Sequence, residues 1–271
     1  MKVAILPYKV ASVSSKRLAK GLEIKGIRTF ESKYEDREGR LVINWGHSKT
    51  PGWYKGEGKI INSFSAVEKA KNKLTSLNIL RDFGVSVPFF TTDRGEAESY
   101  LQVDRNRMVG RTLLEGSRGA GCYLLSSRDE DIEVASGLHD HEYKLFTQYI
   151  PKSAEFRVHV HGGEVFDITQ KKKKSSLSLT TFQYKIRSYE NGWVFCRNGI
   201  EIPPKLEEES IAAVTALGLD FGAVDIVWNR NMGVFVLEVN TAPALTGQTL
   251  ENYIQQFQPL VDEVMEVGGN A

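Results

Sequence analysis

The feature that most constrains this chain is the stretch "FGAVDIVWNRNMGVFVLEVNTAPALTG" at residues 221–247. Its two apolar runs, AVDIVW and VFVLEVN, predict an antiparallel hairpin with a tight turn at Asn231-Met232. In that register Asp225 lies directly opposite Glu238, and Asn240, two residues further on, points to the same face. Two carboxylates opposed across strands are destabilising, so the pattern favours a cation held between them.

The ligand types in this hairpin also indicate which cation it would hold. Carboxylate and amide oxygens are hard ligands that suit Mg²⁺, an ion that keeps water ligands and binds substrate phosphates. In the same register the alternate side chains point into a core; these are Val224, Ile226, Leu237 and Val239. On the residues alone, a solvated strand face that tolerates the repulsion is the alternative interpretation.

The composition excludes several classes of protein. The chain has 271 residues, of which 41% are hydrophobic and 25% charged, typical of a globular protein with one multi-lobed domain or two domains. Because the formal net charge is +1, nucleic acid is not an expected partner, and no apolar run approaches the roughly 20 residues of a membrane span. Two cysteines make neither a disulfide framework nor a structural zinc site, so we expect a cytoplasmic protein.

The order of expected elements indicates an α/β fold. Strands at 3–6 and 40–46 alternate with a helix at 14–25 and with one that begins at a capping box, Ser65–Glu68, and ends at Gly84. Strands then surround a glycine-rich turn, a hairpin turns at Gly162-Gly163, and helices precede and follow the opening stretch. His159 and His161 alternate on one strand, but a zinc site is disfavoured because no third nitrogen or sulfur ligand is nearby.

The glycine-rich turn "RTLLEGSRGAG" is a candidate phosphate cradle. Gly116, Gly119 and Gly121 stand beside Ser117 and Arg118, and successive backbone N–H groups there can form an anion nest. The pattern matches neither the P-loop nor the dinucleotide-binding glycine motif. An ordinary hairpin turn is the alternative.

The lysine run "KKKK" at 171–174 suggests a second phosphate contact. A two-residue turn at Gly162-Gly163 places Arg157 opposite Ile168, so that Lys172 and Lys174 share the face of Arg157. Such a positive patch suits a triphosphate or an acyl phosphate, and a solvated lysine run is the alternative.

The acid pair and amide, followed by "TAPALT", resemble the metal-binding signature of the ATP-grasp enzymes, notably D-alanine–D-alanine ligases and ribosomal-protein glutamate ligases. The chain is also similar to ATP-grasp proteins carried by tailed bacteriophages, and the resemblance covers about residues 65–255. It implies that Asp225, Glu238 and Asn240 bind two Mg²⁺ ions, or Mn²⁺, with Glu238 bridging. Two departures are Ala223, where D-Ala ligases carry an arginine, and Ala244, where these families favour glycine.

The resemblance also implies an ATP site. The hinge that reads adenine through backbone groups would be Gln148, Tyr149 and Ile150, and Glu155 would bond the ribose. The remaining nucleotide contacts implied are Lys73, Arg111 (usually a lysine in the family), Glu115, Gly116, Ser117 and Gly119. The candidate catalytic cations are Arg157 and Lys172 of the patch described above, together with Arg187, which resembles a phosphate-side residue of the family. From the residues alone, Glu155 could equally end a surface strand and Lys73 could be an exposed helix lysine.

The fold implied has an N-terminal α/β lobe (1–88), a small central lid lobe with the glycine loop (89–147) and a C-terminal antiparallel-sheet lobe with the metal site (148–271). The activity implied is an ATP-dependent carboxylate–amine ligase that forms an acyl phosphate and then an amide, releasing ADP and phosphate. A kinase for a small molecule and a non-catalytic ATP-binding module are the alternatives. The expected partners are small-molecule or peptide carboxylates and amines, with Thr249 as a candidate substrate contact, and a homodimer is possible.

Overall fold

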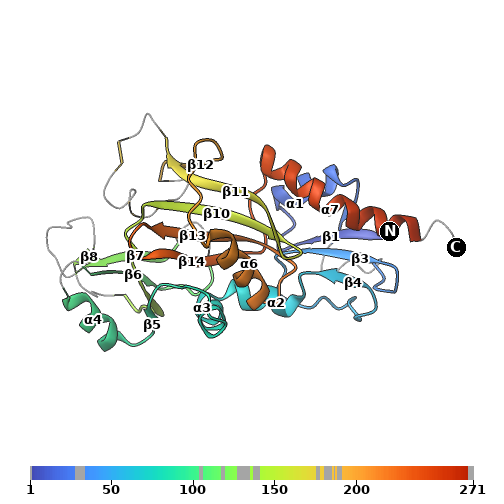
Figure 1. The fold of residues 1–271 in the computed structure, drawn as a ribbon. Coiled ribbons are helices and arrows are strands. Elements are labelled where there is room, and N and C mark those ends of the chain that lie inside the picture. The colour runs from blue at the N-terminus through green and yellow to red at the C-terminus, as the bar shows by residue number, and fades with distance from the viewer. Residues whose placement is uncertain are drawn as a thin grey trace.

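The computed structural model describes residues 2–27, 34–103, 106–116, 120–126, 135–136, 141–174, 178–179, 185, 187 and 191–267. Three sheets follow one another along the molecule (Figure 1). The N-terminal sheet is parallel, with strand order β2-β1-β3-β4; its strands are β1 (Val3–Pro7), β2 (Lys25–Gly26), β3 (Leu41–Trp45) and β4 (Lys59–Ile61). Apart from Asn44, the residues of strands β1 and β3 are apolar, as expected for a parallel sheet with both faces covered.

The central sheet has the order β5-β9-β6-β7-β8 and is antiparallel except between β7 and β8. Its strands are β5 (Phe90–Thr91), β6 (Arg107–Arg111), β7 (Cys122–Ser126), β8 (Ala135–Ser136) and β9 (Leu145–Gln148). Helix α4 (Arg94–Gln102) begins at Asp93, whose side chain accepts from the Glu96 amide. This lobe has its own small core around Met108, Leu125 and Phe146.

The C-terminal sheet is antiparallel, with the order β12-β11-β10-β13-β14. Its strands are β10 (Ala154–His161), β11 (Glu164–Lys173), β12 (Trp193–Cys196), β13 (Phe221–Asn229) and β14 (Gly233–Asn240). Helix α6 (Leu206–Ala216) covers one face, and α7 (Gln248–Val267) lies against the other beside α1 (Val13–Gly21) (Figure 1). Three lobes are therefore present as predicted; the exact boundaries at 88 and 147 stay predictions.

The helical segment after β4 is broken, which the sequence did not predict. Helix α2 (Phe64–Lys71) is capped by the Ser63 side chain, not by Ser65, and α3 (Lys73–Asp82) is a separate helix. Asn72 ends α2 in an extended conformation and caps α3 by accepting from the Thr75 amide at 3.0 Å. The predicted single helix from a Ser65–Glu68 capping box is thus wrong. The break makes Lys73 the first residue of α3.

The N-terminal and C-terminal lobes share one core. Trp45 at the end of β3 stacks on Phe221 of β13 at 5.4 Å, and Tyr253 and Phe257 of α7 pack against both lobes. A buried polar contact adds to this interface: Asn62, after β4, accepts from the amides of Asp220 and Phe221. These contacts fix the N-terminal sheet to the sheet that carries the candidate metal ligands.

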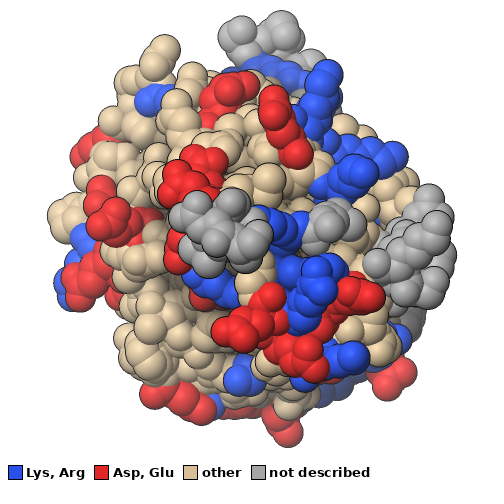
Figure 2. Space-filling model, turned by 90° about the vertical axis from the view of Figure 1, so that its right-hand side faces the viewer, with Lys and Arg blue, Asp and Glu red and all other residues tan. Residues whose placement is uncertain are grey.

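The face of the molecule drawn in Figure 2 carries both acidic and basic side chains. Figure 2 shows acidic and basic side chains side by side over the end of the molecule formed by the N-terminal sheet and α7. In the described part of the chain, no helix is both long and apolar enough to cross a membrane.

Candidate nucleotide and metal site

Asp225, Glu238 and Asn240 face one another as the sequence predicts. Asp225 of β13 pairs with Glu238 of β14, and the Asn240 side-chain amide lies 3.2 Å from Glu238 Oε1 and 3.5 Å from Asp225 Oδ2. The predicted turn is wrong, however, because Asn229 pairs with Gly233 and leaves a three-residue loop. The longer loop shifts the pairing by one residue, and a bulge between the loop and the acids shifts it back. Asp225 therefore pairs with Glu238 as predicted, although neither the loop length nor the bulge was predicted.

The bulge also changes the side of the sheet on which Leu237 lies. This residue is the extra one opposite the Asp225–Ile226 step, and it lines the cavity beside Glu238 rather than entering the core. The predicted placement of Leu237 among the core residues is therefore wrong. Val224, Ile226 and Val239 are buried as predicted, with α6 on their side of the sheet.

Arg157 on β10 holds the buried Asp225 carboxylate. Its Nε and Nη2 donate to the two Asp225 oxygens at 2.7 and 2.8 Å, a bidentate pair. Burial alone would raise the pKa of Asp225, but the Arg157 guanidinium and the Lys171 ammonium hold it well below its usual range. Asp225 is therefore a carboxylate at neutral pH, as a metal ligand must be.

The lysine of the 171–174 run that lines the cavity is Lys171, whereas the prediction was Lys172. A register shift between His159 and Val160 makes Arg157 pair with Thr169 rather than Ile168. Lys171 therefore lies on the site face, whereas Lys172 points to the opposite face and donates to the carbonyls of Asn198 and Gly199. The predicted patch of Arg157 with Lys172 is wrong, and the strand ends at Lys173, before Lys174.

Glu155 is buried between two lysines in the same region. Its carboxylate accepts from Lys152 at 2.9 Å and from Lys171 at 2.5 Å, and only 3% of the residue is exposed. Burial alone would raise the pKa of Glu155, but the two ammonium groups lower it below its ordinary value. Burial lowers the pKa of Lys152. Burial also acts to lower the pKa of Lys171, but the attraction of the Glu155 carboxylate is stronger, so the pKa of Lys171 is raised. The surface-strand-end interpretation of Glu155 is thereby excluded.

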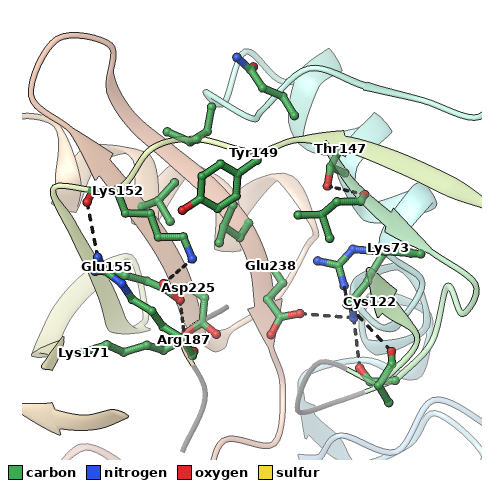
Figure 3. A pocket seen from close by; sticks show the side chains of 18 of the residues that line it. Lys73, Cys122, Thr147, Tyr149, Lys152, Glu155, Lys171, Arg187, Asp225 and Glu238 are labelled. Atoms are coloured by element: carbon green, nitrogen blue, oxygen red, sulfur yellow. Dashed lines mark hydrogen bonds and ion pairs between the residues drawn. The ribbon is translucent and has the colours of Figure 1, made fainter. Parts of the chain in front are cut away.

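A cavity between the central sheet and the C-terminal sheet collects most of the predicted residues (Figure 3). Asp225 and Glu238 project into it from neighbouring strands, opposite Lys73 and Cys122. Arg157 and Asn240 reach it through their bonds to these acids. The predicted site residues that line the cavity are Lys73, Arg111, Gly116, Gln148, Tyr149, Ile150, Glu155, Arg187, Asp225 and Glu238.

Lys73 connects the glycine loop to the acid pair. Its ammonium donates to the Gly116 carbonyl at 3.1 Å and lies 3.3 Å from Glu238 Oε2. Its own amide donates to Leu114 O, so the start of α3 is fixed to the loop. Because its side chain is only 14% exposed, Lys73 is not an ordinary exposed helix lysine.

The remaining nucleotide-side residues are distributed around this contact. Arg111 donates to the Cys122 sulfur at 2.8 Å across the β6–β7 pair. Glu115 is half exposed and forms an ion pair with Lys71 at 2.5 Å. Arg187 is buried, with its guanidinium 4.4 Å from the Trp193 ring. Ser117 and Gly119 lie outside the described residues.

The hinge residues begin at Gln148, the last residue of β9, and continue directly after that strand. The amides of Gln148 and Tyr149 donate to the carbonyls of Phe89 and Arg107. These two amides are thus used within the protein, so a purine edge at the hinge would have to bond other backbone groups there. Lys152, just beyond the hinge, also lies over the Tyr149 ring at 5.9 Å.

The acid pair fits Mg²⁺ by its donor set. Asp225 and Glu238 each keep lone pairs after accepting their protein bonds, and rotation of the Asn240 amide would present its oxygen. Among the described residues no cluster of three or more His, Cys, Asp or Glu could hold a metal, so any ion needs the amide, water or substrate phosphates as further ligands.

The two histidines of β10 serve packing. His159 is buried and its Nδ1 lies 3.0 Å from Tyr253 Oη, and burial lowers its pKa to about 4. His161 packs edge-on against Phe257. Both rings thus make contacts within the protein, and the absence of a zinc site here stays a prediction.

Lys152, Lys171 and Cys122 line the cavity but were not predicted. Lys152 had a usable signal, because it lies three residues before Glu155 in "IPKSAE". Lys171 belongs to the lysine run already noted, but the bulge that selects it over Lys172 leaves no mark on the residue pattern.

Comparison with known proteins decides the family. A family model, the RimK-like ATP-grasp domain, matches residues 70–263, which is well over half of the chain. The chain belongs to the RimK-like ATP-grasp family. The family fold accounts for the parallel N-terminal sheet, the central sheet and the C-terminal antiparallel lobe described above.

Individual relatives of this ATP-grasp chain are distant. It is similar to a probable alpha-L-glutamate ligase of Legionella pneumophila (strain Corby), at 23% identity over 206 residues, which are 74% of this chain and 63% of the relative. The chain thus spans less than two thirds of that relative's length. A similar protein of Shewanella oneidensis, probable alpha-L-glutamate ligase 1, is 25% identical over 75% of this chain and 66% of the relative.

Solved structures share the ATP-grasp fold over nearly the whole chain. The ATP-grasp ligase PsnB, complexed with its minimal precursor, superimposes with a TM-score of 0.67 at 15% identity, covering 98% of this chain and 99% of PsnB. D-alanine–D-alanine ligase from Bacillus anthracis gives a TM-score of 0.66 at 17% identity, covering 98% and 96%. At such identities the likeness concerns the fold. The predicted similarity to phage proteins and the predicted cytoplasmic location stay predictions.

Proposed function

We propose that this protein is an ATP-dependent carboxylate–amine ligase. The observation that carries the proposal is the convergence of Asp225, Glu238 and Asn240 on a cavity whose other wall carries the hinge and the glycine loop. Membership of the RimK-like family supports it. The names of the relatives, alpha-L-glutamate ligase and D-alanine–D-alanine ligase, are consistent with it.

The proposed reaction has two steps. An oxygen of the substrate carboxylate attacks the γ-phosphorus of ATP, and the bond to the β-γ bridging oxygen breaks, which releases ADP. An amine nitrogen then attacks the acyl carbon, phosphate leaves, and the ammonium proton is lost to solvent, which leaves an amide. A nucleophilic side chain is not needed, so the protein contributes positioning and electrostatic stabilisation.

The metal site in this proposal is made of Asp225, Glu238 and Asn240. Two Mg²⁺ ions, with Glu238 bridging and Mn²⁺ able to substitute, would offset the negative charge that develops on the transferring phosphoryl group. A structure of PsnB contains Mg and ADP, which supports Mg²⁺ for this site. Arg157 fixes the orientation of Asp225, and the Asn240 amide spans both carboxylates.

The nucleotide would occupy the cavity between the sheets. The Gln148–Ile150 hinge would read adenine, Glu155 would bond the ribose, and Gly116 with its loop, including Ser117 and Gly119, would cover the phosphates. Arg111 and Lys73 would contact the phosphates from the central-sheet side. On the opposite side, Lys171 takes the place predicted for Lys172 and joins Arg187. Glu115, bound to Lys71, would hold the base of the loop.

The Glu238→Gln variant tests the proposal. The amide removes the charge that would bridge the metal ions while keeping the volume, so ADP release in Mg²⁺ and ATP should fall at least about a hundredfold. The measurement is ADP release over a panel of amino acids and peptides with amine acceptors, with hydroxylamine as a trap. The matched control is Glu201→Gln, at an exposed glutamate, which should behave as the wild type.

The trap also separates this activity from its alternatives. An acyl phosphate reacts with hydroxylamine to give a hydroxamate, whereas a phosphate ester from a kinase does not. Wild-type turnover by Glu238→Gln would defeat the metal assignment. Tight ATP binding without ADP release from any substrate would favour a non-catalytic module.

A further inference from the structure

A second polar cluster lies at the edge of the site face and is not part of the nucleotide cavity. Phe195 lies on β12 and Arg197 directly follows that strand, the edge strand beside β11. Phe195 pairs with Lys171, and its ring lies 4.8 Å from the Arg157 guanidinium and 5.7 Å from the Lys171 ammonium. Because side chains two residues apart share a face, Arg197 projects on the same side as this ring.

Arg197 is held in a fixed orientation. Its Nε and Nη2 donate to the two oxygens of Asp167 at 2.9 and 2.6 Å, and Nη2 also donates to Thr249 Oγ1 at 2.5 Å. Asp167 is buried, with 3% of its side chain exposed, whereas 33% of the Arg197 side chain is exposed. The buried acid and the hydroxyl from α7 therefore orient a guanidinium that reaches solvent.

This arrangement leaves one end of the guanidinium unused. Arg197 has five N–H donors, of which three make the bonds above. The two on Nη1 have no partner among the residues the structure describes. The two N–H groups of Nη1 diverge, so each can donate to a separate acceptor, and one or both can bind an oxygen of an anionic group such as a carboxylate at this oriented, partly exposed guanidinium.

The exposure of the neighbouring Phe195 ring is a second indication of a ligand site. Phe195 is 43% exposed although it lies between cationic groups on the site face. This exposed aromatic ring, beside Arg157 at the candidate metal ligands and two residues from Arg197 along the edge strand, offers an apolar surface for the carbon chain of a ligand. Arg157 would face the group that is phosphorylated, and Arg197 would face a group beyond the ring.

We propose that Arg197, oriented by Asp167 and Thr249, binds a second carboxylate of the acid substrate, one that is not activated. The substrate class is then a dicarboxylic acid or an acidic peptide, whose carbon chain crosses Phe195. Arg197 is a specificity-determining residue in this proposal. The proposal rests on the ligase function proposed above.

The test measures acid binding rather than turnover. The full chain is saturated with Mg²⁺ and the non-hydrolysable analogue AMP-PNP, and binding of propionate, succinate, glutarate and adipate is compared by calorimetry. The best dicarboxylate should bind about ten- to a hundredfold more tightly than propionate, the range for a hydrogen-bonded charged pair. The chain length of the best acid then reports the distance between the two subsites.

Two variants assign that preference to Arg197. Arg197→Met combined with Asp167→Asn removes the guanidinium without leaving a buried carboxylate unpaired, and it should bring the preference to about twofold or less, with AMP-PNP affinity unchanged. Arg197→Lys should keep part of it, because a lysine retains the charge but not the planar donors. Arg230→Met, at an exposed arginine, should keep the whole preference.

Equal binding of mono- and dicarboxylates by the wild type, at any affinity, would overturn the proposal. A preference for dicarboxylates that persists in the Arg197→Met, Asp167→Asn double variant would also overturn the proposal. Neither result bears on the ligase itself, which is judged separately by ADP release and by Glu238→Gln.

Discussion

At the scale of single residues, the site depends on the pairing of buried charges. Asp225 is 5% exposed and Arg157 satisfies both of its oxygens, so each ion compensates the cost of burying the other. Glu155 is likewise a buried carboxylate that is compensated by ion pairs, here with Lys152 and Lys171. Such pairs keep carboxylates ionised inside the fold, as the proposed binding of a metal ion by Asp225 and of a ribose by Glu155 requires.

Replacement of Arg157 should therefore destabilise the protein in a pH-dependent way. Arg157→Gln leaves Asp225 buried without its partner, which should cost about 3–5 kcal/mol of unfolding free energy at pH 7. The pKa of Asp225 is lowered in the fold, so this stabilisation is fully present above the unfolded value of about 3.9 and is lost as the pH falls through the lower folded value.

Urea unfolding of the two proteins at pH 7 and at pH 3 or below measures this effect. The gap between wild type and variant should be widest at pH 7 and should narrow in acid. A gap that is constant with pH would mean that the loss comes from packing of the arginine side chain rather than from the charge.

At the scale of elements, β-bulges decide which side chains reach the cavity. One bulge lies in the β10–β11 hairpin and another in the β13–β14 hairpin, and each changes the pairing by one residue. A one-residue shift moves a side chain to the other face of a sheet, which explains why Lys171 and Leu237 line the cavity.

Neighbouring lysines of β11 provide a matched test of this register. Lys171→Met should weaken ATP binding about tenfold or more, because it removes a cation from the cavity wall and leaves Glu155 with one partner fewer. Lys172→Met should change ATP affinity less than about twofold, because its ammonium bonds loop carbonyls on the other face. Calorimetry with ATP and Mg²⁺ gives both values; the reverse order of effects would contradict the register.

At the scale of the whole molecule, the N-terminal and C-terminal lobes form one packed unit, and the central lobe has a separate core. The contact at Asn62 is part of that unit. Its side chain accepts from two amides and donates to the Phe221 carbonyl at 3.0 Å, and its φ of 62° lies in the left-handed region. Asparagine suits this position because it tolerates that conformation and supplies both kinds of hydrogen-bonding group.

Two substitutions at Asn62 should separate these contributions. Asn62→Gly keeps the conformation but leaves buried amides and a carbonyl without partners, at about 1–3 kcal/mol for each. Asn62→Ala should lose about 1 kcal/mol more, because alanine disfavours the left-handed region. Thermal or urea unfolding gives both losses, and stability equal to the wild type in both variants would show that the contact contributes nothing to joining the lobes.

The sequence by itself determined the donor groups of the candidate metal site and the order of the lobes. Strand alternation placed Glu238 and Asn240 on one face, since residues two apart share a side of the pleat. The pairing of Asp225 with Glu238 also required the bulge that offsets the different turn. Glycine positions also marked the hairpin at Gly162-Gly163 and the helix end at Gly84, where φ is positive.

The tertiary structure alone decided which neighbouring residues complete the site. The bulges that select Lys171, the helix break at Asn72 that brings Lys73 to Glu238, and the pairing of Arg197 with Asp167 depend on contacts between distant segments. Whether a strand accepts an extra residue depends on the packing of both faces against other elements. Local propensity does not contain that information, so these positions follow from the assembled fold.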